Sequence, residues 1–219
     1  MRINFKFIAY LVIAVAFSSA HAGSYDDYFS AIRQDDPRTI QQLLERGFDP
    51  NTVDPAGNHG LFIAVKDGAL KAADVLVAWP KTKVEWRSPK DESPLMMAAL
   101  RGHTELARKL IARDADVNKT GWAPLHYAAT GGHLELMQLL LDENAYIDAE
   151  SPNRTTPLMM AAQYGTTAAV KLLLEAGADP NLRNELGLSA ADFALRANRR
   201  DAAELIADTI RRSRTKGKW

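Results

Sequence analysis

The sequence predicts an all-α solenoid, built from about six helix–turn–helix units that stack in a row. One cassette of residues recurs five times along the chain, and its copies begin 34, 30, 33 and 33 residues apart. The first residues of these copies are Gly57, Asp91, Gly121, Arg154 and Gly187. A constant period between about 20 and 50 residues is typical of arrays in which each unit buries its apolar face against the next.

The first helix of each unit is predicted from the residues that open the cassette. Serine or threonine stands before the helix in three copies, where a side-chain oxygen can accept the N–H groups of a helix N-terminus. These expected N-caps are Ser93, Thr156 and Ser189. Pro124 suits the first turn, because its missing N–H costs nothing there. Gly132 and Gly165 are expected to end the first helix, since glycine adopts positive φ readily.

The second helix of each unit is predicted from the spacing of its leucines. In the clearest copy, Leu136, Leu139 and Leu140 follow the i, i+3, i+4 pattern of a helix that packs one face against a neighbour. Residues 177–181 read Gly-Ala-Asp-Pro-Asn, a run of turn-forming residues that marks the end of such a helix.

The cassette also indicates a family. Residues 123–129 read Ala-Pro-Leu-His-Tyr-Ala-Ala, and residues 154–162 carry Thr-Pro-Leu with two alanines at the same spacing. These motifs resemble ankyrin repeats, and the resemblance covers the chain from about residue 24 onward. It implies an ankyrin-repeat solenoid with short β-hairpin fingers between its helix pairs, which binds other proteins and does not catalyse a reaction.

The resemblance divides the chain into an ankyrin repeat domain at 23–210 and a basic tail at 211–219. Its approximate repeats are 24–56, 57–90, 91–120, 121–153, 154–186 and 187–210, and the first and last are expected to be polar caps. The tail holds five positive charges in nine residues and is expected to be disordered. Its charge is the one feature that suggests contact with an anionic membrane surface.

Two places depart from the regular period. Three residues are missing between Asn118 and Gly121, so the finger before Trp122 is expected to be stunted. The loop from Trp79 to Pro89 carries one extra residue, and its Pro80 is expected to stop the preceding helix early.

Residues 1–22 are expected to be a signal peptide that is removed. Two basic residues precede an uncharged apolar run of 11 residues at 7–17, and a small-x-small site follows, which predicts cleavage between Ala22 and Gly23. The chain contains no cysteine, so it needs no disulfide in an oxidising compartment. Because ankyrin arrays with an export signal point to a bacterial protein, we expect a periplasmic location, with secretion as the alternative.

Composition and motifs favour no catalytic chemistry. The formal net charge is zero and becomes −2 once residues 1–22 leave, which does not favour binding to nucleic acid. The five histidines give no metal pair, and nucleophile and phosphate-loop motifs are absent from the sequence. Met96 and Met159 occupy the histidine slot of the cassette, where core packing is expected and metal binding or oxidation is the alternative. We therefore expect no enzyme activity, no metal, no cofactor and no catalytic residue.

The ankyrin resemblance implies that a partner binds the finger tips and the exposed ends of the first helices. Exposed aromatic and arginine side chains commonly anchor such interfaces. The partner-binding residues expected on this basis are Trp122, Tyr164, Trp86, Arg101, Lys90, Lys66 and Gln163. Packing inside the two irregular loops is the alternative role for Trp122 and Trp86.

These observations predict a monomeric adaptor that binds another protein. Narrower alternatives are an immunity-type inhibitor of a periplasmic toxin and an accessory factor for catalase and peroxide defence, which some similar exported proteins suggest. A small enzyme or ligand-binding protein on a solenoid scaffold is the rival class, and it would need a pocket with convergent carboxylates or histidines.

Overall fold

The computed structural model describes residues 23–215, which are helical apart from turns, loops and one isolated β-bridge. The expected signal peptide, including the cleavage site at Ala22, lies outside the described residues. The chain divides between Lys83 and Val84 into two compact units. The all-helical solenoid of paired helices is confirmed within these units.

The first unit contains two helix pairs. Residues 23–33 are helical and precede α2 (Pro37–Glu45), and α3 (Gly60–Asp67) is followed by α4 (Leu70–Ala78). Tyr28 is fully buried, and its hydroxyl donates a hydrogen bond to the Pro50 carbonyl oxygen at 2.9 Å. A Cβ atom on Gly60 would overlap the Tyr28 ring, so glycine opens α3 because no larger residue fits there.

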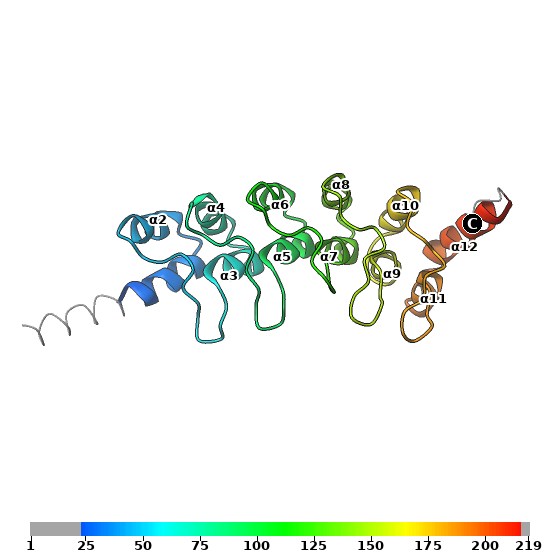
Figure 1. Cartoon of the computed structure of the whole chain (residues 1–219), viewed down its shortest axis with the longest axis horizontal. Coiled ribbons are helices and arrows are strands. Elements are labelled where there is room, and N and C mark those ends of the chain that lie inside the picture. Colours follow the sequence, from blue (N-terminus) through cyan, green and yellow to red (C-terminus); the bar gives the residue numbers. More distant parts are fainter. Residues whose placement is uncertain (1–22, 216–219) are drawn as a thin grey trace, which may run out of the picture. The chain divides into compact units, whose positions relative to one another are not determined.

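The second unit contains four helix pairs. Their bounds are α5 (Pro94–Arg101), α6 (Thr104–Ile111), α7 (Pro124–Gly131), α8 (Leu134–Asp142), α9 (Pro157–Gln163), α10 (Thr167–Glu175), α11 (Ala190–Arg196) and α12 (Arg200–Thr215). The first helices α5, α7, α9 and α11 contact one another in sequence, and α6, α8, α10 and α12 form a second row beside them. Finger loops extend to one side of the first row, and the loop before α7 is visibly the shortest (Figure 1).

The predicted N-caps of the first helices are confirmed. The hydroxyl oxygens of Ser93, Thr156 and Ser189 accept backbone N–H groups three residues later, at 3.2 to 3.4 Å. Fully buried alanines such as Ala128 and Ala129 then let neighbouring first helices approach closely.

The two glycines expected to end first helices behave differently. Gly132 follows α7 with φ +68°, as expected for a left-handed cap. The prediction that Gly165 ends its helix in the same way is wrong. α9 ends at Gln163, Tyr164 is its cap, and Gly165 has no positive φ. A Cβ atom on Gly165 would overlap the Ala129 carbonyl oxygen, so the glycine is needed for the close approach of α7 and α9.

The expected early stop at Pro80 is also wrong. α4 spans nine residues, as α8 and α10 do, and it ends at the same position of the repeat. Only its cap differs, since Trp79 is extended (φ −74°, ψ 123°) where Ala176 after α10 remains helical. A residue before proline is driven to extended backbone, so Pro80 redirects the loop without shortening the helix.

The disordered tail expected at 211–219 is wrong for the part of it that the structure describes. α12 continues through residues 211–215, so a tail that starts at 211 is wrong for these five positions. Arg211 pairs with Asp208, and the Ser213 hydroxyl donates to the Thr209 carbonyl oxygen at 2.8 Å. Basic side chains near a helix C-terminus also interact favourably with the helix dipole. Residues 216–219 lie outside the described part.

Candidate protein-binding site

The finger before α7 lacks the hairpin that the other fingers share. In four fingers a backbone N–H donates to the carbonyl four residues later: Asp54 to Asn58, Ser88 to Glu92, Ser151 to Thr155 and Asn184 to Leu188, at 2.9 to 3.0 Å. Counted back from α7, Asn118 takes the place of these donors, but its N–H donates to the Asp116 carboxylate at 2.9 Å, the bond that Asn51 and Asn181 make just before complete fingers. The predicted stunted finger is therefore confirmed, because three missing residues leave too little chain for the turn.

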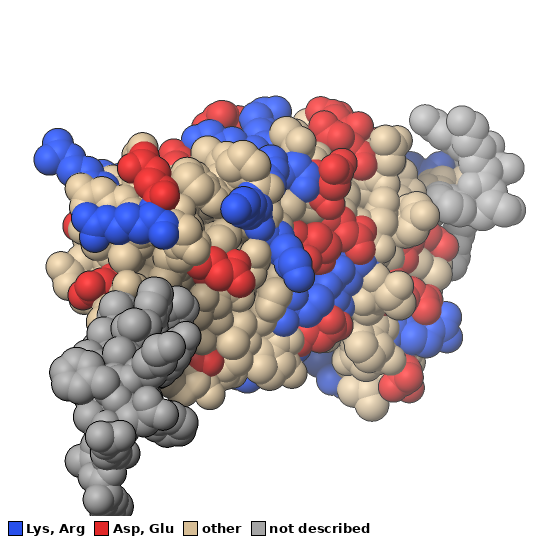
Figure 2. All heavy atoms as spheres, turned by 60° about the vertical axis from the view of Figure 1, so that its left-hand side comes forward, with Lys and Arg blue, Asp and Glu red and all other residues tan. Residues whose placement is uncertain are grey.

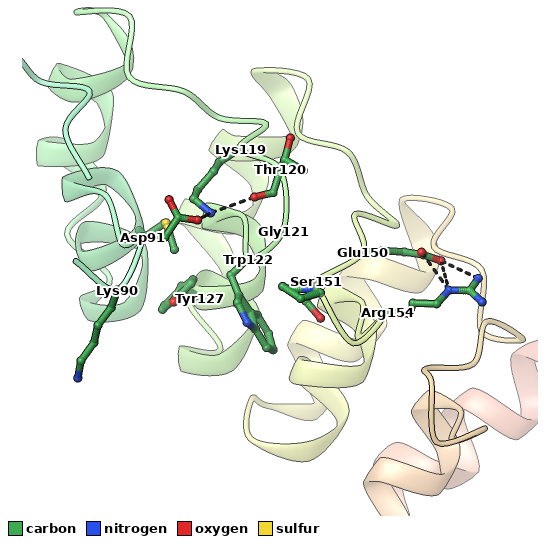
Figure 3. Close-up of a pocket in the computed structure, with 12 residues that line it drawn as sticks. Lys90, Asp91, Lys119, Thr120, Gly121, Trp122, Tyr127, Glu150, Ser151 and Arg154 are labelled. Atoms are coloured by element: carbon green, nitrogen blue, oxygen red, sulfur yellow. Dashed lines mark hydrogen bonds and ion pairs between the residues drawn. The ribbon is translucent and has the colours of Figure 1, made fainter. Parts of the chain in front are cut away.

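A pocket of about 450 Å³ opens where the missing finger would be (Figure 3). Lys90 and Asp91 of the preceding finger line one side, and Glu150 and Arg154 of the following finger line the other. The shortened loop at 119–122 forms its back wall, with Tyr127 of α7 beside it. The pocket size falls in the range of ligand-binding sites, roughly 300–1,000 Å³.

The acidic groups of this pocket are each held by a cation. The Lys119 ammonium, which is almost completely buried, pairs with Asp91 and donates to the Thr120 carbonyl oxygen at 2.9 Å. Arg154 holds Glu150 through two nitrogens at 3.0 and 3.1 Å, and its hydrogen bond keeps the pKa of that carboxyl below its usual value. Two ion-paired carboxylates do not form the proton-sharing pair that acid–base catalysis needs.

The Trp122 side chain lies on a rigid support. Its ring packs edge-on against His126, with centroids 5.2 Å apart and an interplanar angle of 73°. His126 is fully buried, its Nδ1 accepts the Ala123 N–H at 3.1 Å, and its Nε2 donates to the Thr155 carbonyl oxygen at 2.9 Å. Both ring nitrogens are thus committed, which fixes the tautomer and the ring position.

Tyr127 lies next to Trp122 and is half-buried. Burial raises its pKa to about 12, and the charges of Glu92 and Asp91 act in the same direction. The phenol therefore remains a neutral hydrogen-bond donor at physiological pH. Among the described residues its hydroxyl has no hydrogen-bond partner.

An apolar pocket of about 200 Å³ adjoins the first one and shares Trp122 and Tyr127 with it. Leu100 of α5, Thr130 of α7 and Met160 of α9 complete its lining together with His126. We call the joint surface the Trp122 groove, defined by Lys90, Leu100, Trp122, Tyr127, Thr130 and Met160. It combines a polar end between two fingers with an apolar end on three first helices.

Three of the expected partner-binding residues lie in or beside this groove. Trp122 and Lys90 line it, and Arg101 is exposed next to Leu100 at the end of α5. Tyr164 is 59% exposed and Gln163 is half-buried, but neither lines the groove.

The other two expected residues lie elsewhere. Trp86 is half-buried in the loop between Glu85 and Arg87, both of which bond to Asp116. It does not line the groove, which favours the packing role for this residue. Lys66 belongs to the first unit, where its ammonium lies 5.9 Å from the centre of the Phe62 ring.

Tyr127 and Met160 were missed by sequence reasoning. A signal for Tyr127 was present, because the same position of the cassette holds Ile63, Met97 and Met160 in other repeats. A polar aromatic residue in an otherwise apolar slot marks a place where a hydroxyl faces outward. No comparable signal distinguishes Met160.

The methionines of the histidine slot act as core residues. Met96 and Met159 are 1% exposed, and their sulfurs accept the N–H groups of Ser93 and Thr156 at 3.3 and 3.5 Å. Across residues 23–215 no cluster of three or more histidine or acidic side chains is arranged to hold a metal ion.

On the face shown in Figure 2, basic and acidic side chains are interspersed.

Comparison with known proteins identifies the family. Models of the ankyrin repeats match residues 61–151 (three copies) and residues 146–194 (many copies), which together cover more than half of the chain. The chain belongs to the ankyrin repeat family. The crystal structure of the human ASB11 ankyrin repeat domain superposes with a TM-score of 0.72 and 27% identity, over 82% of this chain and 81% of that one.

Curated relatives match this chain over a small part of their own length. The nuclear factor NF-kappa-B p105 subunit of Gallus gallus is 30% identical over 152 residues, which is 66% of this chain and 16% of that protein. The neurogenic locus notch homolog protein 1 of Xenopus tropicalis is 33% identical over 119 residues, 52% of this chain and 5% of that protein. The chain thus spans a small part of these relatives. Ankyrin repeats are generally scaffolds that bind protein partners without catalysis.

No helix within residues 23–215 is long and apolar enough to cross a membrane.

Proposed function

We propose that this chain is a non-catalytic adaptor that acts in the periplasm and binds a partner protein through the Trp122 groove. The groove carries the proposal, because it joins a polar pocket and an apolar pocket at the one shortened finger of the second unit. Membership of the ankyrin repeat family supports protein binding, and the signal-like residues 1–22 support export.

The binding surface is tested by recovering partners of the mature chain (residues 23–219) from periplasmic extract. Trp122→Ala is expected to reduce recovery of the partner at least tenfold, since a half-buried tryptophan at the centre of a contact commonly anchors it. Tyr146→Ala is the matched control, because Tyr146 is 68% exposed and lies outside the groove. Equal recovery by folded wild type and folded Trp122→Ala would refute the placement.

Export is tested by expressing the full chain in a Gram-negative host and releasing the periplasm by osmotic shock. Mass spectrometry of the released protein is expected to give a chain that begins at Gly23. An intact N-terminus found only in the cytoplasmic fraction contradicts export, and a cleaved chain found in the medium favours the secreted alternative.

The identity of the recovered partner distinguishes the immunity role from the role in peroxide defence. Recovery of a toxin that the chain inhibits supports the immunity role, whereas recovery of a catalase supports the role in peroxide defence. Neither role changes the proposed surface, and the enzyme alternative is disfavoured because each pocket carboxylate is neutralised by its own cation.

A further inference from the structure

We propose that the Trp122 groove recognises an extended peptide segment of its partner in which an acidic side chain is followed, one to three residues later, by one large apolar side chain. This rests on the proposed function in protein binding. It adds the chemical class of the bound segment and assigns each end of the groove to one side chain.

Three hydrogen-bond donors point to the acidic side chain. The side chains of Lys90, Tyr127 and Trp122 line the same pocket. The Lys90 ammonium, which extends away from Trp122 in Figure 3, the Tyr127 hydroxyl and the Trp122 indole N–H have no hydrogen-bond or ion-pair partner among the described residues. In Figure 3, Tyr127 lies between Lys90 and Trp122, below the Lys119–Asp91 pair. Donors that line one pocket and lack acceptors of their own suit an acceptor-only group, and an ionised carboxylate accepts on both oxygens.

The local charges favour an anion over a cation. The Asp91–Lys119 and Glu150–Arg154 pairs cancel, which leaves Lys90 as the uncompensated charge of the pocket lining.

One nearby anion opposes this preference. Glu92 lies close enough to raise the pKa of Tyr127, and its carboxylate reaches only the Ser88 hydroxyl, at 3.5 Å. Because Glu92 is outside the pocket lining, we place the incoming carboxylate between Lys90 and Trp122, with a moderate gain in affinity.

The apolar pocket selects the second side chain. Its volume of about 200 Å³ equals the space of six or seven water molecules at ~30 Å³ each, enough for one large side chain but not for a helix. Leu100 and Met160 supply apolar walls, and Leu100 is 37% exposed. Since Trp122 and Tyr127 belong to both pockets, the two recognised side chains must be neighbours on an extended segment.

Selection of random linear 12-residue peptides on phage tests the peptide class without knowledge of the partner. Selection on the mature chain is expected to enrich Asp or Glu followed within three residues by Phe, Trp, Leu or Met. A parallel selection on Lys90→Glu is expected to lose the acidic position and keep the apolar one. Enrichment without an acidic position, or identical enrichment on both proteins, overturns the proposal.

Affinities of one selected peptide test the individual donors. We expect Lys90→Ala, Tyr127→Phe and Trp122→Phe each to weaken binding about three- to tenfold, as for a hydrogen bond or exposed ion pair to a charged group. Lys90→Ala and Tyr127→Phe should change binding of the matching Asn or Gln peptide less than twofold, whereas Trp122→Phe should also weaken the amide peptide, because Trp122 lines the apolar pocket as well. Lys171→Ala is the control, since Lys171 is an exposed lysine on α10 outside the groove. For Lys90→Ala and Tyr127→Phe, equal losses for acidic and amide peptides would overturn the assignment.

The two proposals fail in different ways. If peptides show no acidic preference while Trp122→Ala still abolishes recovery of the partner, the peptide class is wrong and the proposed function stands. If recovery of the partner does not depend on Trp122, the proposed binding surface itself is wrong. The retained circular dichroism and thermal unfolding of each variant show that a loss of binding does not come from a loss of fold.

Discussion

The third residue of α5, α7 and α9 does the same structural work with different chemistry in each helix. His126 accepts the N–H of the residue three positions earlier through Nδ1, and Met96 and Met159 accept it through sulfur. Only His126 also reaches the next finger, where it donates to the Thr155 carbonyl oxygen. The histidine thus joins two neighbouring repeats, while the methionines close their own helix start.

Replacing His126 separates these two contributions. His126→Ala is expected to lower the free energy of unfolding by about 3–5 kcal/mol, because it leaves a cavity, removes the acceptor of the buried Ala123 N–H and removes one of the two donors to the Thr155 carbonyl oxygen, which keeps the Ser151 N–H. His126→Met keeps an acceptor for the Ala123 N–H and should cost about 1–2 kcal/mol. Urea unfolding at pH 7 measures both, and equal losses would show that the contact with Thr155 dominates.

His59 makes stability depend on pH. Burial lowers the pKa of His59 to about 4, with Asp49 opposing the shift and Lys83 adding to it, whereas an unfolded histidine titrates near 6.5. The unfolded chain therefore binds a proton that the native chain does not, and stability falls as the pH drops from about 6.5 toward 4. At pH 4.5 the loss at this site should reach about 2.5 kcal/mol.

The variant His59→Thr tests this dependence, since threonine caps the helix at this slot in the repeat of Thr156. Urea unfolding at pH 7 and pH 4.5 should show a smaller acid loss for the variant than for wild type. Other acid-sensitive groups, including His126, remain in both proteins, so only the difference is interpreted. Parallel pH profiles would contradict the role of His59.

At the scale of elements, the second unit depends on close contact between first helices and on the loops that follow them. Gly165 allows α9 to approach the carbonyl of Ala129 in α7, and the finger between these helices is complete. The finger before α7 is incomplete, and a pocket lies on that side of α7. The groove therefore arises because the loop before α7 is too short to fill the space beside this helix.

Restoring the finger should remove the site without harming the fold. In this variant Lys119 and Thr120 are replaced by the five residues Ala-Glu-Ser-Pro-Asn, copied from 149–153 of the next finger. The added chain can form the missing hairpin and fill the pocket, so a selected peptide should bind at least tenfold more weakly. A control of the natural length replaces Lys119 and Thr120 by Ser-Asn, so that it loses the same two residues without gaining a finger. Unchanged affinity in the restored finger would show that the pocket does not contribute.

Sequence patterns predicted most elements but not their contacts. The N-cap of α5 at Ser93 was predictable because capping is local, and the stunted finger followed from counting residues. Gly165 was misassigned because the sequence is the same whether a glycine at a helix end adopts a positive φ or makes room for a neighbouring helix. Tyr127 was missed as a site residue because the absence of an acceptor near its hydroxyl is a property of the assembled repeats. Residues 211–215 were misread because a run of charges resembles a solvated tail.

At the scale of the whole molecule, the two units differ in how many repeats they hold. Residues 84–215 contain four helix pairs, whereas residues 23–83 contain two. Repeat arrays commonly need three or more units for stability, since each buries its apolar face on its neighbours. The larger unit therefore has enough repeats to fold independently, and every residue of the Trp122 groove belongs to it.

A chain of residues 84–219 tests this inference. We expect it to be helical, to unfold cooperatively and to bind a selected peptide within about threefold of the mature chain. Circular dichroism, urea unfolding and fluorescence titration measure these properties. An unfolded fragment would contradict independent stability, and a folded fragment that does not bind would show that residues 23–83 contribute to recognition.

The shortened finger has a consequence for how proteins of this kind are compared with one another. The finger differs from the others in its number of residues, so an alignment of the repeats shows it as a gap and not as a substituted position. Substitution scans change what is present and leave that gap untouched, and they would assign the groove to Trp122 alone. Insertions and deletions at the fingers are the changes that can create or erase such a site in one step, while the helices on either side retain their sequence.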